Sequence, residues 1–282
     1  GTLIHNYGPH IFHTNDEKVF SFLSKYTDWV DFQYKPKGNS ELGLISLPYS
    51  KKTKKEIGRD LSQEEIVSYI FKDYSEKQWG VPFEKIPKSI TNRIPKTIEC
   101  EDPTWFKDDK YQCLPKGGYT KMMNKMLEGI DVQLSSCDED WKNYKADIVI
   151  YTGKIDEFYD YKFGRLEYRS LIFKHTVSEE KMGYVVENQN NKKVSYTRKY
   201  DHSYPNHSGN TTVITEEYPV DYNGKNTPFY PIPFGESNKI YLKYLKASLK
   251  EENTIFLGRL ATYKYLDMWM AIKQTMLKLK KV

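Results

Sequence analysis

The stretch from residue 254 to residue 268 constrains the fold most, because it has the pattern of a buried strand that turns directly into a helix. The apolar run 254–257 has the length of a buried strand, and apolar residues recur at helical spacing after residue 268. Gly258 permits a sharp turn and a close approach of the backbone to a ligand. Arg259, Tyr265 and Asp267 are among the polar and aromatic residues on this junction. α/β proteins commonly build binding sites at such junctions, and an ordinary strand–loop–helix corner is the alternative.

Length, charge and cysteine content narrow the class of protein. The chain has 282 residues and a net charge of +5, enough for two or three packed units. Its main basic runs, 51–55 and 278–281, have the pattern of solvated surfaces, so nucleic-acid binding is not predicted. Three cysteines without a CxxC pair imply neither a disulfide framework nor a zinc site, and indicate the reducing cytoplasm. The sequence contains no signal peptide and no apolar run of membrane-spanning length.

Periodicity and turn residues predict the elements of a mixed α/β chain. We expect a helix from about residue 15 to 26, a hairpin within 29–48, a linker or exposed helix at 51–60 and a helix that begins at Ser62. Residues 146–151 have the pattern of a buried strand, and we expect it to be parallel to its neighbours. Antiparallel strands are expected at 167–176, 183–188, 193–198 and 211–217, followed by a helix at about 237–250.

Two further stretches carry candidate binding residues. Gly8 and Pro9 force a turn, and His10 and His13 follow three residues apart. Because no third ligand is nearby, a backbone turn held near a ligand is preferred over a metal site. A second stretch ends the helix that begins at Ser62. Tyr74 and Trp79, five residues apart and followed by a glycine, could stack on a flat ligand, or could form a helix end packed on the core.

Several stretches, taken together and in order, resemble the UDP-galactopyranose mutase family. They are Gly8 to Thr14, Lys77-Gln78-Trp79-Gly80, Leu114 to Thr120, Tyr151 to Asp156, Phe163 to Leu171, Tyr196-Thr197-Arg198, and Gly258 through Met268. The resemblance covers nearly the whole chain. It implies an isomerase that interconverts UDP-galactopyranose and UDP-galactofuranose for galactofuranose-containing cell-surface glycans. In this family reduced FAD is the nucleophile: its N5 attacks the anomeric carbon as UDP leaves, which gives a covalent adduct with no net redox change.

The resemblance also implies roles for individual residues. Arg93 and Arg198 match the two arginines that hold the UDP pyrophosphate, where a fixed guanidinium suits a dianionic leaving group. The other substrate-side matches are Phe71, Tyr74 and Trp79 at the uridine, Asn188 at the substrate, and Tyr230 and Tyr265 at the diphosphate. The flavin-side matches are Pro9, His10, His13, Gly153, Arg259, Asp267 and Met268.

The implied fold is an FAD-binding, Rossmann-like α/β domain with two inserted units. The FAD-binding domain would comprise residues 1–28, 113–155 and 237–282, and a helical substrate or lid domain residues 50–92. An antiparallel β-sheet domain would comprise residues 29–49, 93–112 and 156–236. The glycine-rich GxGxxG turn that should open the FAD-binding domain is absent here, so we expect this domain to be incomplete at its N-terminus. The stretch between Pro48 and Leu61 is also short for the family's helical domain.

The sequence is therefore compatible with three functions. The first is the flavin-dependent mutase acting on UDP-galactose, for which a homodimer is the expected assembly. The second is a truncated or degenerate paralogue that binds a UDP-sugar without catalysis. The third is a flavin amine oxidase or a related redox enzyme, which the paired arginines and the Lys77–Gly80 stretch disfavour, because these residues suit a nucleotide sugar.

Overall fold

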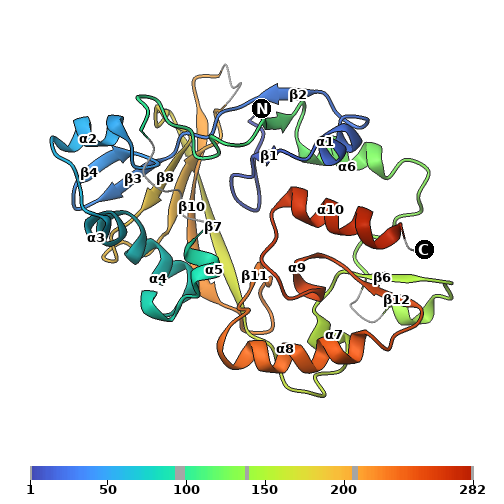
Figure 1. Ribbon diagram of the computed structural model, residues 1–282. Helices are drawn as coiled ribbons and strands as arrows, with labels where there is room; N and C mark the ends of the chain where they lie inside the picture. Colours follow the sequence, from blue (N-terminus) through green and yellow to red (C-terminus); the bar gives the residue numbers. More distant parts are fainter. Residues whose placement is uncertain (1, 93–98, 137–139, 205–208, 281–282) are drawn as a thin grey trace. The chain divides into compact units, whose positions relative to one another are not determined.

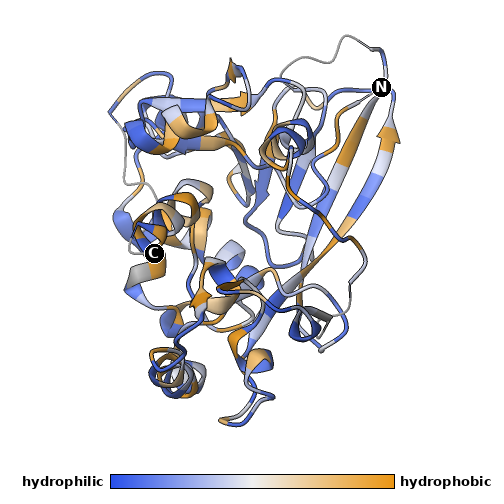
Figure 2. Cartoon of the chain, turned by 90° about the vertical axis from the view of Figure 1, so that its right-hand side faces the viewer, coloured by the Kyte–Doolittle hydropathy of each residue, from blue (hydrophilic) through white to orange (hydrophobic). Residues whose placement is uncertain are grey.

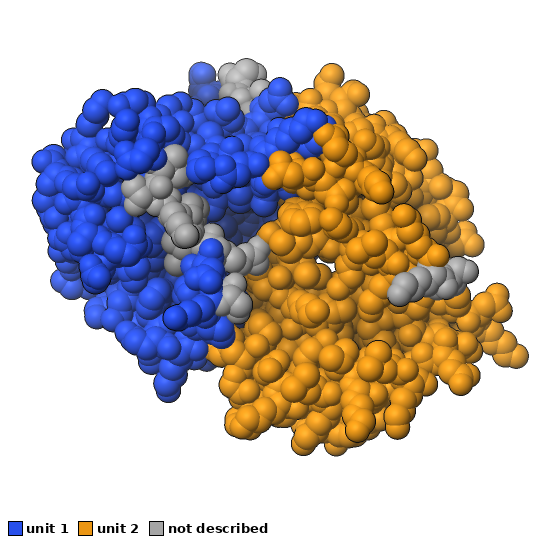
Figure 3. Space-filling view, in the orientation of Figure 1, with its two compact units in different colours: residues 1–13, 31–113, 168–229 blue, residues 14–30, 114–167, 230–282 orange. Residues whose placement is uncertain are grey.

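A computed structural model describes residues 2–92, 99–136, 140–204 and 209–280. The chain is of mixed α/β type and forms two compact units, each assembled from three segments (Figures 1 and 3). Unit 1 comprises residues 1–13, 31–113 and 168–229, and unit 2 comprises residues 14–30, 114–167 and 230–282. The three-domain division expected from the sequence stays a prediction.

Unit 1 is built on a mainly antiparallel sheet whose strands follow in the order β7-β10-β9-β8-β3-β4. Their bounds are Tyr168–Ser178, Thr212–Asp221, Arg198–Asp201, Val186–Gln189, Lys37–Ser40 and Gly43–Ser46. All neighbouring pairs are antiparallel except β3 and β8, which run parallel. The antiparallel sheet and the early hairpin expected from the sequence are therefore present.

The register of this sheet gives its two faces different chemistry. On one face, Lys174, Glu216, Lys199, Glu187 and Lys37 stand opposite one another on β7, β10, β9, β8 and β3. Opposite charges on adjacent strands favour this register, and a slip by one residue would bring every side chain to the other face. The other face carries Asn188, Arg198 and Glu217 as cross-strand neighbours. We call this second face the site face.

Short helices follow the β3–β4 hairpin within unit 1. They are α2 (Lys51–Ile57), α3 (Gln63–Ile66), the π-helix η1 (Val67–Lys72), α4 (Asp73–Trp79), the 3₁₀ turn η2 (Phe83–Lys85) and α5 (Lys88–Thr91). Apolar side chains from the hairpin and the helices form one core: Ile45, Leu47, Tyr49, Leu61, Ile66, Ile70 and Phe71. Ser50 and Ser62 cap α2 and α3 with reciprocal side-chain bonds.

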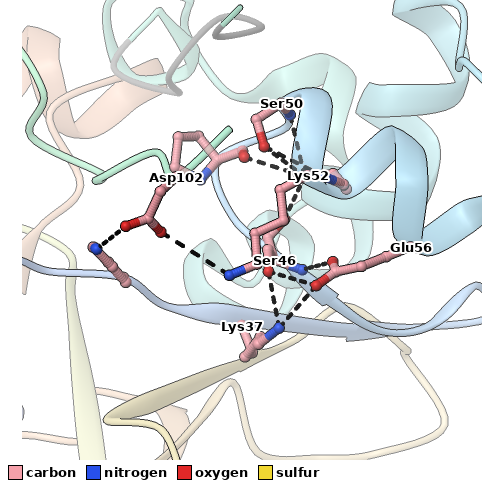
Figure 4. Close-up of polar contacts among 9 residues, drawn as sticks. Lys37, Ser46, Ser50, Lys52, Glu56 and Asp102 are labelled. Carbon is pink, nitrogen blue, oxygen red and sulfur yellow. Dashed lines mark hydrogen bonds and ion pairs between the residues drawn. The ribbon is translucent and has the colours of Figure 1, made fainter. Parts of the chain in front are cut away.

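Glu56 attaches α2 to the hairpin (Figure 4). Its carboxylate accepts hydrogen bonds from the backbone N–H and the hydroxyl of Ser46, and it lies 3.1 Å from Lys37 Nζ. Burial opposes ionisation of Glu56, but the bonds from Ser46 and Lys37 outweigh it and lower the pKa of the carboxyl. The exposed ion pair of Asp102 with Lys52 in the same view and the exposed pair of Asp102 with Lys35 contribute little by comparison.

Unit 2 contains a parallel pair of strands and the longest helices. β6 (Val149–Tyr151) and β12 (Thr254–Phe256) run parallel, as the sequence predicts. The other elements are α1 (Glu17–Leu23), α6 (Tyr119–Met126), η3 (Asp140–Asn143), α7 (Ile155–Phe158), β11 (Tyr230–Pro231), α8 (Gly235–Ser248), α9 (Gly258–Ala261) and α10 (Met268–Leu279). An aromatic cluster lies beside β6. Phe158 stacks on Trp141 and makes edge-to-face contacts with Tyr151 and Phe256.

A separate three-stranded sheet has the order β1-β5-β2. Its strands are Phe12–Thr14, Tyr111–Pro115 and Trp29–Asp31, and the chain passes from one unit to the other within each of them. Helices of both units carry hydrophilic as well as hydrophobic residues (Figure 2). Within the described part of the chain, none of the helices combines the length and the apolar character needed to cross a bilayer.

A chain of hydrogen bonds in unit 1 connects His5, His202, Thr215 and His175. His202 Nδ1 accepts from the His5 backbone N–H at 3.2 Å, so its Nε2–H donates to Thr215 Oγ1 at 2.8 Å. The Thr215 hydroxyl in turn lies 2.7 Å from His175 Nδ1. Burial, together with the neighbouring His5 and His175, lowers the pKa of His202 to about 4, while Asp201 opposes the shift.

We expect folding stability to fall as the pH drops from 6.5 towards 4. Above pH 6.5 His202 is neutral in both states; below it the unfolded chain binds a proton that the folded chain excludes, which costs at most about 3 kcal/mol. Urea unfolding at pH 7.0 and 4.5 measures the loss. His202→Gln should remove this part of the pH dependence, and an unchanged dependence in that variant would rule out His202 as its source.

Candidate active site

The site face of unit 1 brings together one predicted arginine, one predicted asparagine and an acid that the sequence analysis missed. Asn188 on β8, Arg198 on β9 and Glu217 on β10 are direct cross-strand neighbours. The Arg198 Nε and Nη2 donors contact both carboxylate oxygens of Glu217 at 2.8–3.2 Å. The Glu217 side chain has no exposed surface, whereas that of Arg198 is 19% exposed. Glu217 therefore fixes the plane of the guanidinium from beneath.

Tyr34 lies beside this pair, and both charges of the pair affect its pKa. Burial raises the pKa of Tyr34 to about 12, with Glu217 raising it further and Arg198 lowering it. The Tyr34 hydroxyl therefore stays neutral and forms a hydrogen bond with Arg198. Its ring stacks on Phe106, and Phe106 stacks on His13 with centroids 3.6 Å apart. Tyr34 thus connects the Arg198–Glu217 pair to the predicted flavin-side histidine.

The turn at residues 8–10 packs against the Arg198–Glu217 pair. Gly8 has φ +103°, and a Cβ atom there would lie 3.3 Å from Glu217 Oε2 and 3.5 Å from Arg198 Nη2. Only glycine combines this backbone conformation with so close an approach. His10 Nδ1–H donates to the Gly8 carbonyl at 2.9 Å, which fixes the ring over the turn that contains Pro9. His13 Nδ1 lies 2.5 Å from Asp109 Oδ2.

The predicted uridine-side aromatics come from one helical stretch of unit 1. Phe71 on η1 is 6% exposed and belongs to the apolar core of the hairpin. Trp79, the last residue of α4, is 7% exposed, and Tyr74 lies in the first turn of the same helix, half-buried. Phe71 thus occupies a core position, and the role of all three residues at a nucleotide stays a prediction. Arg93 lies outside the described residues.

In unit 2, the structure brings together Tyr230, Tyr265 and Arg259. The two tyrosine rings stack with centroids 5.6 Å apart, and Arg259 Cζ lies 5.5 Å and 4.8 Å from them. Arg259 Nε donates to the Leu266 carbonyl at 2.8 Å. Tyr263, 1% exposed, holds this turn by donating its hydroxyl to the Glu167 and Ile232 carbonyls. The cation-π contacts thus present a guanidinium and two phenols from one rigid cluster.

The remaining flavin-side residues lie at the carboxyl ends of the parallel strands and at the start of α10. Gly153 follows β6 by two residues and Gly258 follows β12 by two. Gly258 has φ +79°, and the nearest atom to a Cβ there would be Thr152 Cβ at 3.8 Å. Asp267 is the N-cap of α10 and Met268 its first residue. A Cβ at Gly258 would thus make only an ordinary contact, whereas one at Gly153 would lie 2.6 Å from the Tyr151 hydroxyl. The N-terminus of α10 is the part of this group that favours an electron-rich ring or a phosphate.

The comparison with protein families decides the assignment. Residues 69–265 match the model of the family described as UDP-galactopyranose mutase. The chain belongs to the UDP-galactopyranose mutase family. The resemblance found in the sequence is thereby confirmed, and the chain is a member of a family of isomerases.

Individual members of the UDP-galactopyranose mutase family match over nearly the whole chain. The dTDP-fucopyranose mutase of Escherichia coli is 31% identical over 97% of this chain and 84% of its own length. The probable UDP-galactopyranose mutase of Klebsiella pneumoniae is 31% identical over 97% and 80%, and the enzyme of Mycoplasma genitalium is 33% identical over 96% and 80%. The Escherichia coli alignment spans 319 positions against 282 residues here, so that relative carries segments without a counterpart in this chain.

A solved structure supports the fold independently. A crystal structure of reduced UDP-galactopyranose mutase matches with a TM-score of 0.63, covers 96% of this chain and 82% of its own, and is 12% identical. This likeness confirms a mixed α/β fold of the same kind. The incomplete N-terminus and the inserted units of the sequence analysis stay predictions.

Proposed function

We propose that this protein interconverts UDP-galactopyranose and UDP-galactofuranose. The observation that carries the proposal is Arg198, set on a fully buried Glu217 and beside Asn188, in a chain of the mutase family. Departure of UDP develops negative charge on a diphosphate, and a guanidinium of fixed plane stabilises such charge without reorganisation. The family resemblance assigns the second guanidinium to Arg93, and contacts with the diphosphate to Tyr230 and Tyr265.

The nucleotide would bind along the aromatic residues of η1 and α4. Tyr74 and Trp79 offer flat faces for a uracil ring, and Phe71 would close the apolar side behind it. Asn188, whose side-chain oxygen is buried without a partner within the described residues, would orient the sugar. These residues bind and orient the substrate, and they exclude water from the bond that breaks.

The proposed cofactor is FAD in its reduced form, which supplies the nucleophilic nitrogen when bound. The residues that the family resemblance proposes for it are Pro9, His10, His13, Gly153, Arg259, Asp267 and Met268. The free thiols of Cys100 and Cys113 support a cytoplasmic enzyme. A homodimer, and a role in supplying galactofuranose to cell-surface glycans, are part of the same proposal.

The named relatives leave two nucleotide sugars to compare. Two are called UDP-galactopyranose mutases, and one, of similar identity, is called dTDP-fucopyranose mutase. dTDP-fucopyranose is therefore the second candidate substrate. It presents a thymine in place of uracil and a sugar that lacks one hydroxyl. A UDP-sugar-binding paralogue without catalysis is the other alternative.

We expect the protein to convert UDP-galactofuranose into UDP-galactopyranose only when its FAD is reduced. Purified protein is incubated with FAD and dithionite, and the two sugar nucleotides are separated by chromatography; samples with oxidised FAD serve as the control. dTDP-fucopyranose is tested in parallel at the same concentration. UDP binding by calorimetry without any turnover would identify the non-catalytic paralogue, and failure to bind either nucleotide would contradict the proposal.

A further inference from the structure

The ammonium group of Lys77 lies at the centre of a loop that joins two strands of the site face. Lys77 Nζ lies 2.9 Å from the carbonyl oxygen of Gln189, 3.2 Å from that of Asn191, 2.9 Å from that of Val194 and 2.8 Å from that of Tyr196. These carbonyls belong to the end of β8 and to residues 190–197, which connect β8 to β9. An ammonium has three N–H donors. The four carbonyl oxygens, which we call the cage, therefore engage all of them.

The cage keeps Lys77 charged and leaves it no donor for a substrate. Burial lowers the pKa of Lys77 to about 8, and Asp73 opposes the shift. The four carbonyl dipoles point their negative ends at the nitrogen and also favour the charged form. At pH 7 the loop is therefore folded around a cation that the helix α4 provides.

Three more hydrogen bonds attach α4, one to the 190–197 loop and two to the sheet. The Lys192 N–H donates to Asp73 Oδ2 at 3.0 Å, at the start of α4. At its end, Arg169 on β7 donates from Nε to the Gln78 carbonyl at 3.0 Å and from Nη2 to the Lys77 carbonyl at 3.1 Å. A buried cation at the helix C-terminus satisfies carbonyls that lack a partner within the helix.

The elements connected by Lys77 are those that carry the proposed nucleotide site. α4 bears Tyr74 and Trp79 at its two ends. Asn188 immediately precedes the caged segment on β8, and Arg198 immediately follows it as the first residue of β9. A displacement of the loop relative to α4 would therefore move the aromatic residues relative to the guanidinium.

We propose that Lys77 is a positioning residue for nucleotide-sugar binding: it sets the distance between the aromatic helix α4 and the strands that hold Asn188 and Arg198. The inference rests on the proposed function, because it takes those residues to be the site. Lys77 acts through the 190–197 loop and does not touch the substrate.

The test compares two lysines of one helical stretch. Lys77→Met keeps the length and apolar stem of the side chain and removes the charge. Lys72→Met is the matched control, because Lys72 makes an exposed ion pair with Glu84 at 3.3 Å and such pairs contribute little. We expect Lys77→Met to raise the Kd for UDP and the KM for UDP-galactofuranose by about tenfold or more. kcat at saturation should stay within about threefold, and Lys72→Met should match the parent protein.

A second variant tests the cage directly. Lys77→Ala leaves four carbonyls around a space that n-propylammonium can fill, so this cation, and not sodium at equal ionic strength, should restore UDP affinity. If Lys77→Ala folds poorly, its refolding yield is measured with and without n-propylammonium. The inference is overturned if n-propylammonium improves neither the yield nor the affinity for UDP.

The outcomes separate this inference from the proposed function. A parent protein that binds no UDP contradicts the proposed function. A parent that binds UDP while Lys77→Met binds it equally well leaves the function standing and removes Lys77 as a positioning residue. A fall in kcat at unchanged KM would also overturn the inference, because it would assign Lys77 to the chemical step.

Discussion

Arg198→Lys should lower kcat/KM for UDP-galactofuranose by about 100-fold or more, while the protein stays folded. Lysine keeps the positive charge, so Glu217 remains paired, but an ammonium is a point charge that cannot grip two oxygens in one plane. In the parent protein Nε and Nη2 are held by both oxygens of Glu217, so the guanidinium is oriented before substrate arrives. Loss of one such fixed donor group costs about 3–4 kcal/mol of transition-state stabilisation.

The neighbouring residue gives the control for this prediction. Lys199 follows Arg198 on β9 and, by the alternation of the strand, belongs to the opposite face, where it stands between Glu216 and Glu187. Lys199→Met should retain activity within about threefold. Steady-state kinetics with reduced FAD and circular dichroism spectra measure both variants. Equal activity of Arg198→Lys and the parent protein would exclude a bidentate role for Arg198.

Local patterns in the sequence are sufficient to predict the strand-to-helix junction at residues 254–268. The strand β12, the turn at Gly258 and the helix α10 are all present, because period and turn chemistry act over a few residues. The strand expected at 146–151 is present as β6 over Val149–Tyr151 and pairs in parallel with β12. The prediction that it is buried is wrong, because Ile150 is 47% exposed. The stretch expected to be a strand at 193–198 is different: most of it is loop, and β9 begins only at Arg198.

The reason for this difference is a single distant side chain. Val194 and Tyr196 alternate with polar residues, which is the pattern of a strand. Their carbonyls, however, point at Lys77 Nζ, which lies more than a hundred positions earlier in the chain. Backbone acceptors engaged by an ammonium are not available to a neighbouring strand. A local pattern contains no information about this competition.

Glu217 could not be identified as part of the site for a similar reason. It follows Glu216 in a polar stretch of β10. Two adjacent acids in a sequence normally predict that both side chains are exposed to solvent. Its burial and its contact with Arg198 follow from the register of β9 and β10, where the two residues stand opposite each other. Which of the two glutamates faces the arginine is decided by that register, and a slip of one residue would exchange them.

Removal of Glu217 alone should destabilise the fold more than removal of the whole pair. Glu217→Leu leaves Arg198 without its partner in a site that is largely closed to water, and such a change costs about 3–5 kcal/mol. Arg198→Met leaves a fully buried carboxylate uncompensated and should cost a similar amount. The double variant Arg198→Met/Glu217→Leu buries neither charge, so its loss should be well below the sum of the two single losses.

Urea unfolding of the parent, both single variants and the double variant completes this cycle. Because the double variant should lose less stability than either single variant, the coupling energy should exceed one single loss, about 3–5 kcal/mol. Glu216→Leu, on the opposite face, should couple with Arg198→Met by less than about 0.5 kcal/mol. Additive losses would mean that the two charges do not depend on each other. The double variant should regain stability but not turnover. The cycle therefore separates the contribution of the pair to folding from the contribution of Arg198 to substrate binding. The fold tolerates an apolar pair, whereas a diphosphate requires the guanidinium.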